Sequence, residues 1–442
     1  MRRPGVLTLV VVAVLLVRTG LGVRAGADEP TPEANVIAKI EELDGYVVRD
    51  DDLPGRPVTA VGFVQRCDLS LLKEFQHLTG LYLAGARVTE AGLKELKTLD
   101  TLRELDLAGT HVTDTGLKEL KTLQNLEELD LSDTYVTDAG LTELKPLRNL
   151  ERLDLSNTHI TDAGLKELGP LDRLTALYLV ETRITDAGLK ELGPFDHLTV
   201  LYLAETRISD AGARELKRFG GLEELDLSGT HVSDEGLKEI GQLANLAELD
   251  VSDTHISGAG LKLLAGCEKL TRLGVADDGI TDAGLRELKP LKGLEQLALA
   301  GPLTDAGLKE LRQFDQLTEL DLSNTHITDA GLKELKPLEN LTELALSGTK
   351  TTDAGLKHIK GLAKLTQLDV SKTHITDAGL KELRALKNLE YLDLSGTHVT
   401  DSGLEELKQF TSLAEISLVG TLTTDAGLED LEQALPDLEI GK

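Results

Sequence analysis

The feature that most constrains this chain is a sequence repeat of 24 residues. The stretch DLSNTHITDAGLKEL occurs twice, letter for letter, at residues 154–168 and 321–335. Aligned on the Asp position of the motif T-D-A-G-L, the chain holds fifteen copies between residues 90 and 425, spaced by 24 residues except for one step of 23. A fixed period of this size is typical of a solenoid, in which each unit buries its apolar face against its neighbours. We therefore expect one long array rather than several globular domains.

Each repeat predicts a strand, a turn and a short helix. In one copy, Leu153 and Leu155 alternate as in a β-strand, whereas Leu165, Leu168 and Leu171 follow helical spacing. Connections this short make successive strands parallel and place the helices on the other side of the sheet. The predicted fold is an α/β solenoid of about fifteen repeats. We expect a curved βα horseshoe with a parallel sheet on its concave face and short helices on its convex face.

The pattern LxxLxLxxTxITDAGLKEL resembles the leucine-rich repeat, over about residues 81–428. The closest likeness is to the cysteine-containing type found in F-box substrate receptors, which is also ribonuclease-inhibitor-like, in its exported bacterial TDAGL form. Thr158 and its equivalents stand where that family usually has Asn or Cys, and a Thr hydroxyl can still bond the backbone of the neighbouring turn. An F-box-like ubiquitin role is disfavoured, because the chain has no F-box and begins like an exported protein.

The N-terminus has the pattern of a signal peptide. Arg2 and Arg3 precede an apolar run, Val6 to Val17, that is too short to span a bilayer. Small residues at 25–27 predict cleavage after Ala27. We therefore expect residues 1–27 to be a signal peptide and the mature protein to be secreted or periplasmic, in the cell envelope, with no stable membrane insertion.

The remaining chain divides into three predicted parts. Residues 28–80 are expected to form an acidic lead and an N-terminal cap, with a short helix at 35–43 and strands within 46–64. The solenoid is expected at 81–428, followed by a C-terminal cap at 429–442.

The composition excludes one class of partner. The formal net charge is −29, and it becomes −33 when the four Arg of residues 1–27 are removed. Nucleic acid binding needs a basic stripe, which the chain lacks. Three interpretations of the negative charge remain: it attracts a cationic partner, it binds Ca²⁺, or it only keeps the protein soluble. Cys67 and Cys267 lie eight repeats apart, too far to be bridged, so both are expected to be free thiols and Cys267 to be buried.

A repeated His and Asp pair resembles a catalytic site, but its repetition argues against one. His159 stands three residues before Asp162, and the same spacing recurs in five further repeats. An active site needs one constellation with a third group and a pocket, so we expect no enzyme, no catalytic residue and no cofactor. His231 with His255, and His374 with His398, occupy adjacent repeats and could approach to about 5–6 Å. Because two exposed His make only a weak site, we expect solvent-facing turn residues and no metal site.

Two other repeated residues have structural explanations. The Asp of the anchor begins a helix, so Thr161 or Asp162 is expected to cap its free N–H groups. The Gly two residues later occurs in all fifteen copies, although Gly weakens a helix. We attribute it to close packing between stacked units.

Acidic residues dominate the register that faces outward from the strands. Parallel stacking would put these like charges about 5 Å apart, which favours a basic partner, bound cations or plain solvation. The resulting negative trough is predicted to contain Asp106, Asp130, Asp154, Asp226 and Asp250.

Two adjacent repeats break this column with an apolar and aromatic island, and Tyr and Arg are favoured interface anchors. The predicted contact residues there are Tyr178, Val180, Arg183, Val200, Tyr202 and Arg207, beside Ala176 and Ala204. A second break, near Arg272, Gly274 and Gln296, is interpreted as a bend. The function predicted is therefore that of a monomeric scaffold binding a basic protein or peptide. The alternative is a structural or Ca²⁺-binding envelope protein.

Overall fold

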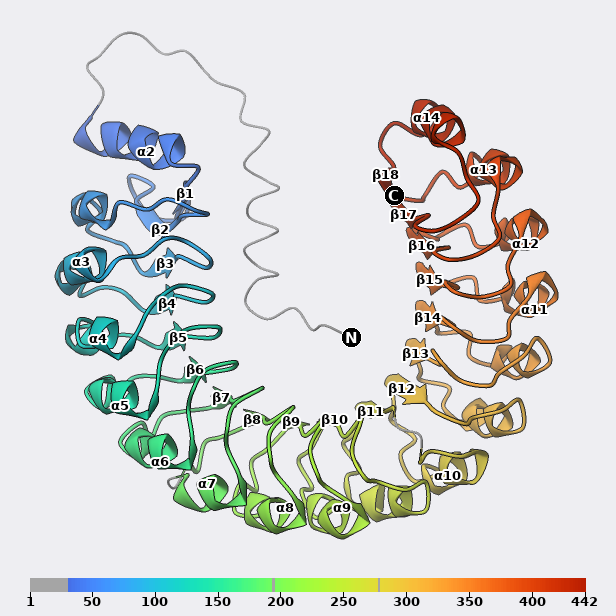
Figure 1. The fold of residues 1–442 in the computed structure, drawn as a ribbon, viewed down its shortest axis with the longest axis horizontal. Helices are drawn as coiled ribbons and strands as arrows, with labels where there is room; N and C mark the ends of the chain where they lie inside the picture. The colour runs from blue at the N-terminus through green and yellow to red at the C-terminus, as the bar shows by residue number, and fades with distance from the viewer. Residues whose placement is uncertain (1–30, 193–194, 277–278) are drawn as a thin grey trace. The chain divides into compact units, whose positions relative to one another are not determined.

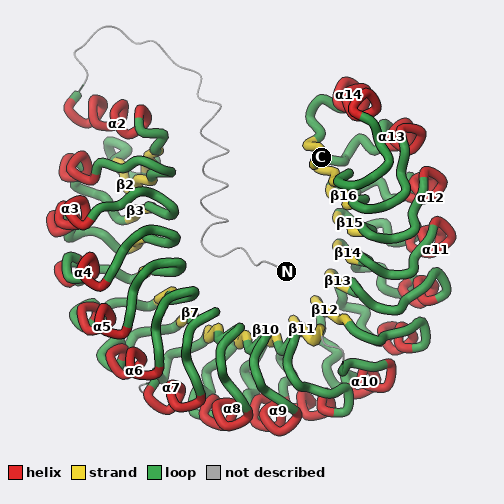
Figure 2. The backbone as a smooth tube through the Cα atoms, viewed as in Figure 1, coloured by secondary structure: helices red, strands yellow, loops and turns green. Residues whose placement is uncertain are grey.

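The computed structural model describes residues 31–192, 195–276 and 279–442, so the predicted signal peptide lies outside the described residues. The chain forms two compact units, unit 1 up to Leu174 and unit 2 from Thr175 to Lys442. Both are built from strands and short helices that alternate along the chain, joined by long loops (Figure 2).

Unit 1 begins with a helix and a β-hairpin. Helix α2 (Pro32–Glu42) is capped by Thr31, whose hydroxyl accepts a bond from the Ala34 N–H, and it buries Val36 and Ile40. Strands β1 (Tyr46–Arg49) and β2 (Val58–Gly62) pair antiparallel, and β2 pairs parallel with the first repeat strand. The helix and strands predicted before residue 64 are thereby confirmed. The parallel strands of unit 1 that follow are β3 (Gly80–Tyr82), β4 (Glu104–Asp106), β5 (Glu128–Asp130) and β6 (Arg152–Asp154).

The helices of unit 1 are short and partly of the 3₁₀ type. They are η2 (Leu69–Glu74), α3 (Glu90–Leu93), η3 (Lys94–Thr98), α4 (Asp114–Leu117), η4 (Leu120–Thr122), α5 (Asp138–Leu141), η5 (Thr142–Leu144), α6 (Asp162–Leu165) and η6 (Lys166–Leu168).

Unit 2 continues the same alternation. Its strands are β7 (Ala176–Tyr178), β8 (Val200–Tyr202), β9 (Glu224–Asp226), β10 (Glu248–Asp250), β11 (Arg272–Ala276), β12 (Gln296–Ala300), β13 (Glu319–Asp321), β14 (Glu343–Ala345), β15 (Gln367–Asp369), β16 (Tyr391–Asp393), β17 (Glu415–Ser417) and β18 (Glu439–Gly441). Its helices are α7 (Asp186–Glu191), α8 (Asp210–Leu216), α9 (Asp234–Ile240), η7 (Gly260–Gly266), α10 (Asp282–Glu287), η8 (Gly307–Gln313), η9 (Gly331–Leu335), α11 (Asp353–Ile359), α12 (Asp377–Leu383), α13 (Asp401–Leu407) and α14 (Asp425–Ala434).

Within each unit the strands line one side and the helices the other (Figure 1). The pairing is parallel and in register, so Leu105, Leu129 and Leu153 stack on successive strands and are at most 2% exposed. The predicted order of strand, turn and helix is therefore confirmed. At the second break in the columns, β11 and β12 are five residues long and pair over their full length.

The core is a stack of leucines with few aromatic rings. Phe195 and Phe314 are fully buried, and Cys267 is a buried free thiol among leucines, as predicted. Thr158 is also buried, but its hydroxyl donates to the Leu155 carbonyl of its own repeat at 2.6 Å. The bond predicted to a neighbouring turn is therefore made within the repeat.

The repeated Asp does not cap its own helix. Thr161 caps α6 by accepting from the Ala163 N–H at 3.3 Å. The carboxylate of Asp138, one repeat earlier, accepts from the N–H and the hydroxyl of Thr161, at 2.8 and 2.6 Å. We call this pair of bonds a carboxylate rung, and it recurs in both units, for example from Asp353 to Thr376.

The repeated Gly is explained by the same carboxylate. A Cβ on Gly164 would lie 2.4 Å from Oδ1 of Asp138, and most other glycines of this register meet the preceding rung at 2.0 to 2.7 Å. In unit 2 the Gly212 N–H also donates to Asp186 at 2.9 Å. The close packing predicted at this Gly is thus confirmed, with a carboxylate as the neighbour.

Candidate ligand-binding face

The side chains that point from the strands away from the helices form what we call the strand face. On it the predicted acidic residues stack in register, since Asp106 pairs with Asp130, Asp130 with Asp154, and Asp226 with Asp250. Parallel neighbouring strands lie about 4.8 Å apart, so these carboxylates are close neighbours.

Each of these carboxylates is also tied to the turn that follows it. The Ala108 N–H donates to Asp106 at 2.9 Å, and the N–H and hydroxyl of Ser132 donate to Asp130 at 2.8 and 2.6 Å. The N–H of Ser228 donates to Asp226 and the N–H of Ser252 donates to Asp250, both at 2.9 Å. Asp106 is only 5% exposed. Solvation, one of the three ways considered for relieving the like charges, is therefore small at this residue.

Burial also changes the charge of this column in unit 1. It raises the pKa of Asp106 to about 6, and the neighbouring Asp130 adds a smaller increase against the lowering effect of the Ala108 N–H. The pKa of Asp154 is raised to about 7, first by burial and then by the charge of Asp130. Burial raises the pKa of Asp130 as well. The column therefore holds part of its protons near neutral pH, and its negative charge is smaller than the sequence indicates.

The raised pKa of Asp154 predicts a stability that falls as pH rises. Between about pH 4 and 7 Asp154 is protonated in the folded state but ionised in the unfolded chain. The free energy of unfolding therefore falls as the pH rises through this range, and stays lower above it. We expect Asp154→Asn to raise the free energy of unfolding at pH 8 by about 1–3 kcal/mol, after discounting for partial exposure, and to change it little at pH 4. Urea denaturation at the two pH values measures this.

The matched control is Asp430→Asn. Lys408 lowers the pKa of that exposed carboxylate through a hydrogen bond, so its neutralisation should give no stabilisation at pH 8. An equal effect of Asp154→Asn at both pH values would contradict the assignment.

The apolar island forms a continuous patch on β7 and β8. Tyr178 pairs with Tyr202, and their ring centroids lie 5.0 Å apart at an interplanar angle of 82°. The Tyr202 hydroxyl donates to Glu224 at 2.9 Å. Both rings are partly exposed, as are Val180 and Val200.

The tyrosine patch is defined here as Tyr178, Val180, Val200 and Tyr202. Arg183 and Arg207 lie at its edge, exposed in the following turns, whereas Ala176 and Ala204 are buried and contribute no surface. The structure thus brings the predicted contact residues together, without the two alanines.

One feature of this patch was missed from the sequence. Glu181 and Glu205 both have φ of 55°, in the left-handed region. Most other repeats place Gly, Asn or Asp at this turn position, and a larger residue there is strained by about 1–3 kcal/mol. The sequence contains a sign of this, because the triplet E-T-R occurs only at residues 181–183 and 205–207 and places Glu at the turn position. The two repeats that carry the tyrosines therefore also carry backbone strain.

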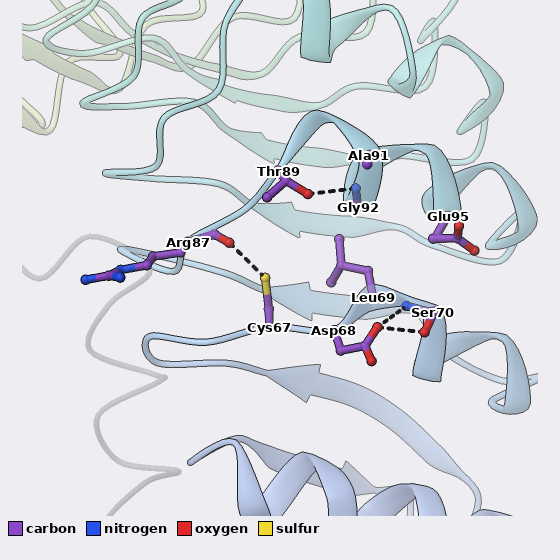
Figure 3. Close-up of a pocket in the computed structure, with 9 residues that line it drawn as sticks. All are labelled: Cys67, Asp68, Leu69, Ser70, Arg87, Thr89, Ala91, Gly92 and Glu95. Atoms are coloured by element: carbon purple, nitrogen blue, oxygen red, sulfur yellow. Dashed lines mark hydrogen bonds between the residues drawn. The ribbon is translucent and has the colours of Figure 1, made fainter.

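A cavity of about 250 Å³ lies in unit 1 between η2 and α3 (Figure 3). Asp68 accepts two bonds from Ser70, Thr89 accepts from the Gly92 N–H, and the Arg87 side chain points away from the cavity. Burial, and then the charge of Asp68, raises the pKa of the Cys67 thiol. The thiol therefore stays protonated and lacks the character of a nucleophile.

The position of the cavity follows from the carboxylate rungs. A Cβ on Gly92 would meet nothing closer than Thr89 Oγ1 at 3.4 Å, because no carboxylate from the preceding segment fills this space. We therefore interpret the cavity as the space between η2 and α3 that a carboxylate rung fills between later repeats.

Two further findings concern metals and membranes. In the part of the chain that the structure describes, no group of three or more His, Cys, Asp or Glu side chains is arranged to hold a metal ion. Among those same residues, no helix has both the length and the apolar character needed to cross a bilayer.

The comparisons with known proteins agree with this architecture. The family described as leucine-rich repeat region matches residues 180–418, which is more than half of the chain. The chain belongs to the leucine-rich-repeat family. Two further leucine-rich-repeat descriptions match residues 124–167 and 99–121 of this leucine-rich-repeat protein. Its cysteine-containing subtype stays a prediction. The comparison with curated proteins gives no match.

Solved structures show the same fold. A leucine-rich-repeat protein of Leptospira interrogans is 24% identical over 92% of this chain and 98% of its own, with a TM-score of 0.51. TLR13, solved in complex with ssRNA13, is 19% identical over 86% of this chain and 61% of its own, with a TM-score of 0.52. Leucine-rich-repeat proteins are typically non-enzymatic binding scaffolds, which suggests a protein–protein interaction scaffold here.

Proposed function

We propose that this leucine-rich-repeat protein is an exported scaffold that binds a basic protein or peptide through the strand face, with the tyrosine patch as its anchor. The observation that carries the proposal is the pairing of Tyr178 and Tyr202 on adjacent strands, beside strands β9 and β10, which carry only acidic residues outward. Aromatic anchors next to a charged surface are the arrangement in which a few residues supply most of the binding free energy.

Charge supports a basic ligand. Glu224 and Asp226 of β9 pair in register with Glu248 and Asp250 of β10, so like charges stand opposite one another. Arg272 of β11 bonds Glu248 at 2.8 Å and offsets part of this repulsion. Lys or Arg side chains of a ligand would relieve the rest.

The alternative of a Ca²⁺-binding or purely structural protein has less support. Ca²⁺ takes six to eight oxygen ligands from a flexible loop. Here Asp226 and Asp250 each have one carboxylate oxygen bonded to the turn that follows. A nucleic-acid ligand is disfavoured by the net charge of −29.

The proposal is tested by comparing capture by the wild-type protein and by the double variant Tyr178→Ala/Tyr202→Ala. Proteins retained from the source organism's envelope extract are identified by mass spectrometry, and the one most enriched is purified and titrated by calorimetry. Loss of both rings should weaken its binding about 100-fold or more, because buried tyrosines rank among the strongest interface anchors.

Tyr135→Ala is the matched control. Tyr135 is 55% exposed in a turn and lies outside the patch, so its removal should leave the affinity unchanged. Unchanged affinity of the double variant, with its fold intact by circular dichroism, would refute the patch as the binding site.

A further inference from the structure

Two histidines on adjacent repeats of unit 2 lie in an arrangement that can chelate a metal. His231 and His255 are both exposed, and their ring centroids are 5.8 Å apart with an interplanar angle of 68°. Their backbones are fixed, since the N–H groups donate to the carbonyls of Ile208 and Val232 at 2.8 and 2.9 Å. The scaffold therefore fixes the backbone positions of the two histidines relative to each other.

The distance between the two ring centroids is compatible with both rings binding one metal ion. A metal bound about 2.1 Å from an imidazole nitrogen lies about 3.2 Å from the ring centroid, so two rings on one ion hold their centroids between about 4.5 Å at 90° and about 6.4 Å at 180°. The observed 5.8 Å falls inside this range without backbone movement.

A second histidine pair makes a useful contrast. The centroids of His374 and His398 are 6.3 Å apart, and the rings are nearly parallel, at 19°. This separation is at the upper limit of the range, which only two rings on opposite sides of one ion reach. This pair is therefore the poorer chelator.

The surroundings of His231 and His255 suit a cation on balance. The Glu205 carboxylate lies over Gly229, two residues before His231, and the exposed Asp253 stands two residues before His255. Arg207 occupies the same turn position one repeat earlier, which opposes a cation on that side, whereas Gly279, one repeat later, adds no charge. The net negative charge of the chain adds a general attraction for cations.

We propose that His231 and His255 form a two-histidine site for a borderline transition-metal ion, Cu²⁺ above Ni²⁺ and Zn²⁺, with water completing the coordination. Imidazole nitrogens suit these ions and do not suit Ca²⁺ or Mg²⁺. The sequence alone predicted solvent-facing residues here, because it gives only the approximate spacing of the two backbones and not the distance between the rings. The site is independent of the proposed protein ligand.

The test is calorimetric titration of the intact protein with Cu²⁺ in the presence of glycine as a competing chelator. We expect one saturable site that His231→Ala and His255→Ala each weaken about tenfold or more, since either change removes the chelate. His326→Ala and His374→Ala/His398→Ala should leave this site unchanged. Electron paramagnetic resonance should show two nitrogen ligands in the wild type and one in either single variant.

Two results would overturn the proposal. One is retention of the wild-type affinity in the double variant His231→Ala/His255→Ala. The other is a loss in each single variant no larger than that caused by His326→Ala, which would mean that the histidines act separately.

Discussion

Replacing Gly241 by Ala should destabilise the protein by about 2–4 kcal/mol, whereas the same change at Gly169 should stabilise it by about 0.4–1 kcal/mol. Both glycines follow a helix in the same register, and both have right-handed backbone angles. Gly169 precedes Pro170, which disfavours these angles for other residues, but Lys145 adopts them in the same register before Pro146. They differ in the space available. A Cβ on Gly241 would lie 2.0 Å from the Leu263 carbonyl of η7, while one on Gly169 would meet only the Lys166 carbonyl, at 3.5 Å.

The clash at Gly241 involves backbone on both sides, so no side chain can rotate to relieve it. Urea denaturation of the two variants measures the difference, and Gly361→Ala, where a Cβ would meet nothing within 4 Å, serves as a second control. Equal stability of the Gly241 and Gly169 variants would contradict the packing described between α9 and η7.

Removing one carboxylate rung should also be costly. Asp353→Ala deletes the acceptor for the N–H and the hydroxyl of Thr376, at 2.8 and 2.7 Å, both part-buried. Hydrogen bonds to a charged group contribute about 1.5–3 kcal/mol each, and water replaces part of what is lost, so we expect a destabilisation of about 2–3 kcal/mol. Asp353→Asn keeps one acceptor and should cost roughly half as much.

A double-mutant cycle connects the rung to the repeated Gly. A Cβ on Gly379 would lie 2.5 Å from Oδ1 of Asp353, so Gly379→Ala should destabilise the wild type and cost much less in the Asp353→Ala background. We expect a coupling free energy of about 1 kcal/mol or more from chemical denaturation of the four proteins. Strict additivity would show that the carboxylate is not what excludes a side chain at Gly379.

The chain contains a natural example of a missing rung. Gly258 stands where other repeats have Asp, and Thr281, the residue it would bond, has no side-chain cap bond. A Cβ on Gly284 would lie 2.7 Å from the Cα of Gly258, so two backbones have closed on the vacant space. At this position the absence of a carboxylate is accommodated by the close approach of Gly258 and Gly284.

The repeat unit was predictable because its period fixes the register. Leu153 and Leu155 alternate in the strand, and Leu165 and Leu168 follow in the helix. Of the two predicted candidates for the cap, Thr161 and Asp162, Thr161 caps the helix. The partner of each Asp was not predictable. Whether Asp138 bonds its own helix or Thr161, 23 residues later, depends on how closely two units stack. Sequence spacing does not contain that distance.

The positions of the candidate site residues were predictable from the sequence, but their burial and their pKa values were not. Strand alternation placed Tyr178 beside Tyr202, and the pairing confirms it. The same alternation placed Asp106 on the strand face, but its burial and raised pKa depend on the turns around it. The left-handed backbone of Glu181 and Glu205 could have been noticed, because most other repeats place Gly, Asn or Asp there.

The most direct test of the central claim is hydrogen exchange of this protein with and without its captured partner. The proposed function predicts protection of the amides in residues 176–182 and 200–206, at the tyrosine patch and its turns, with no change in helix α11 on the opposite side of unit 2. Protection confined to the helices, with the partner still bound, would contradict it.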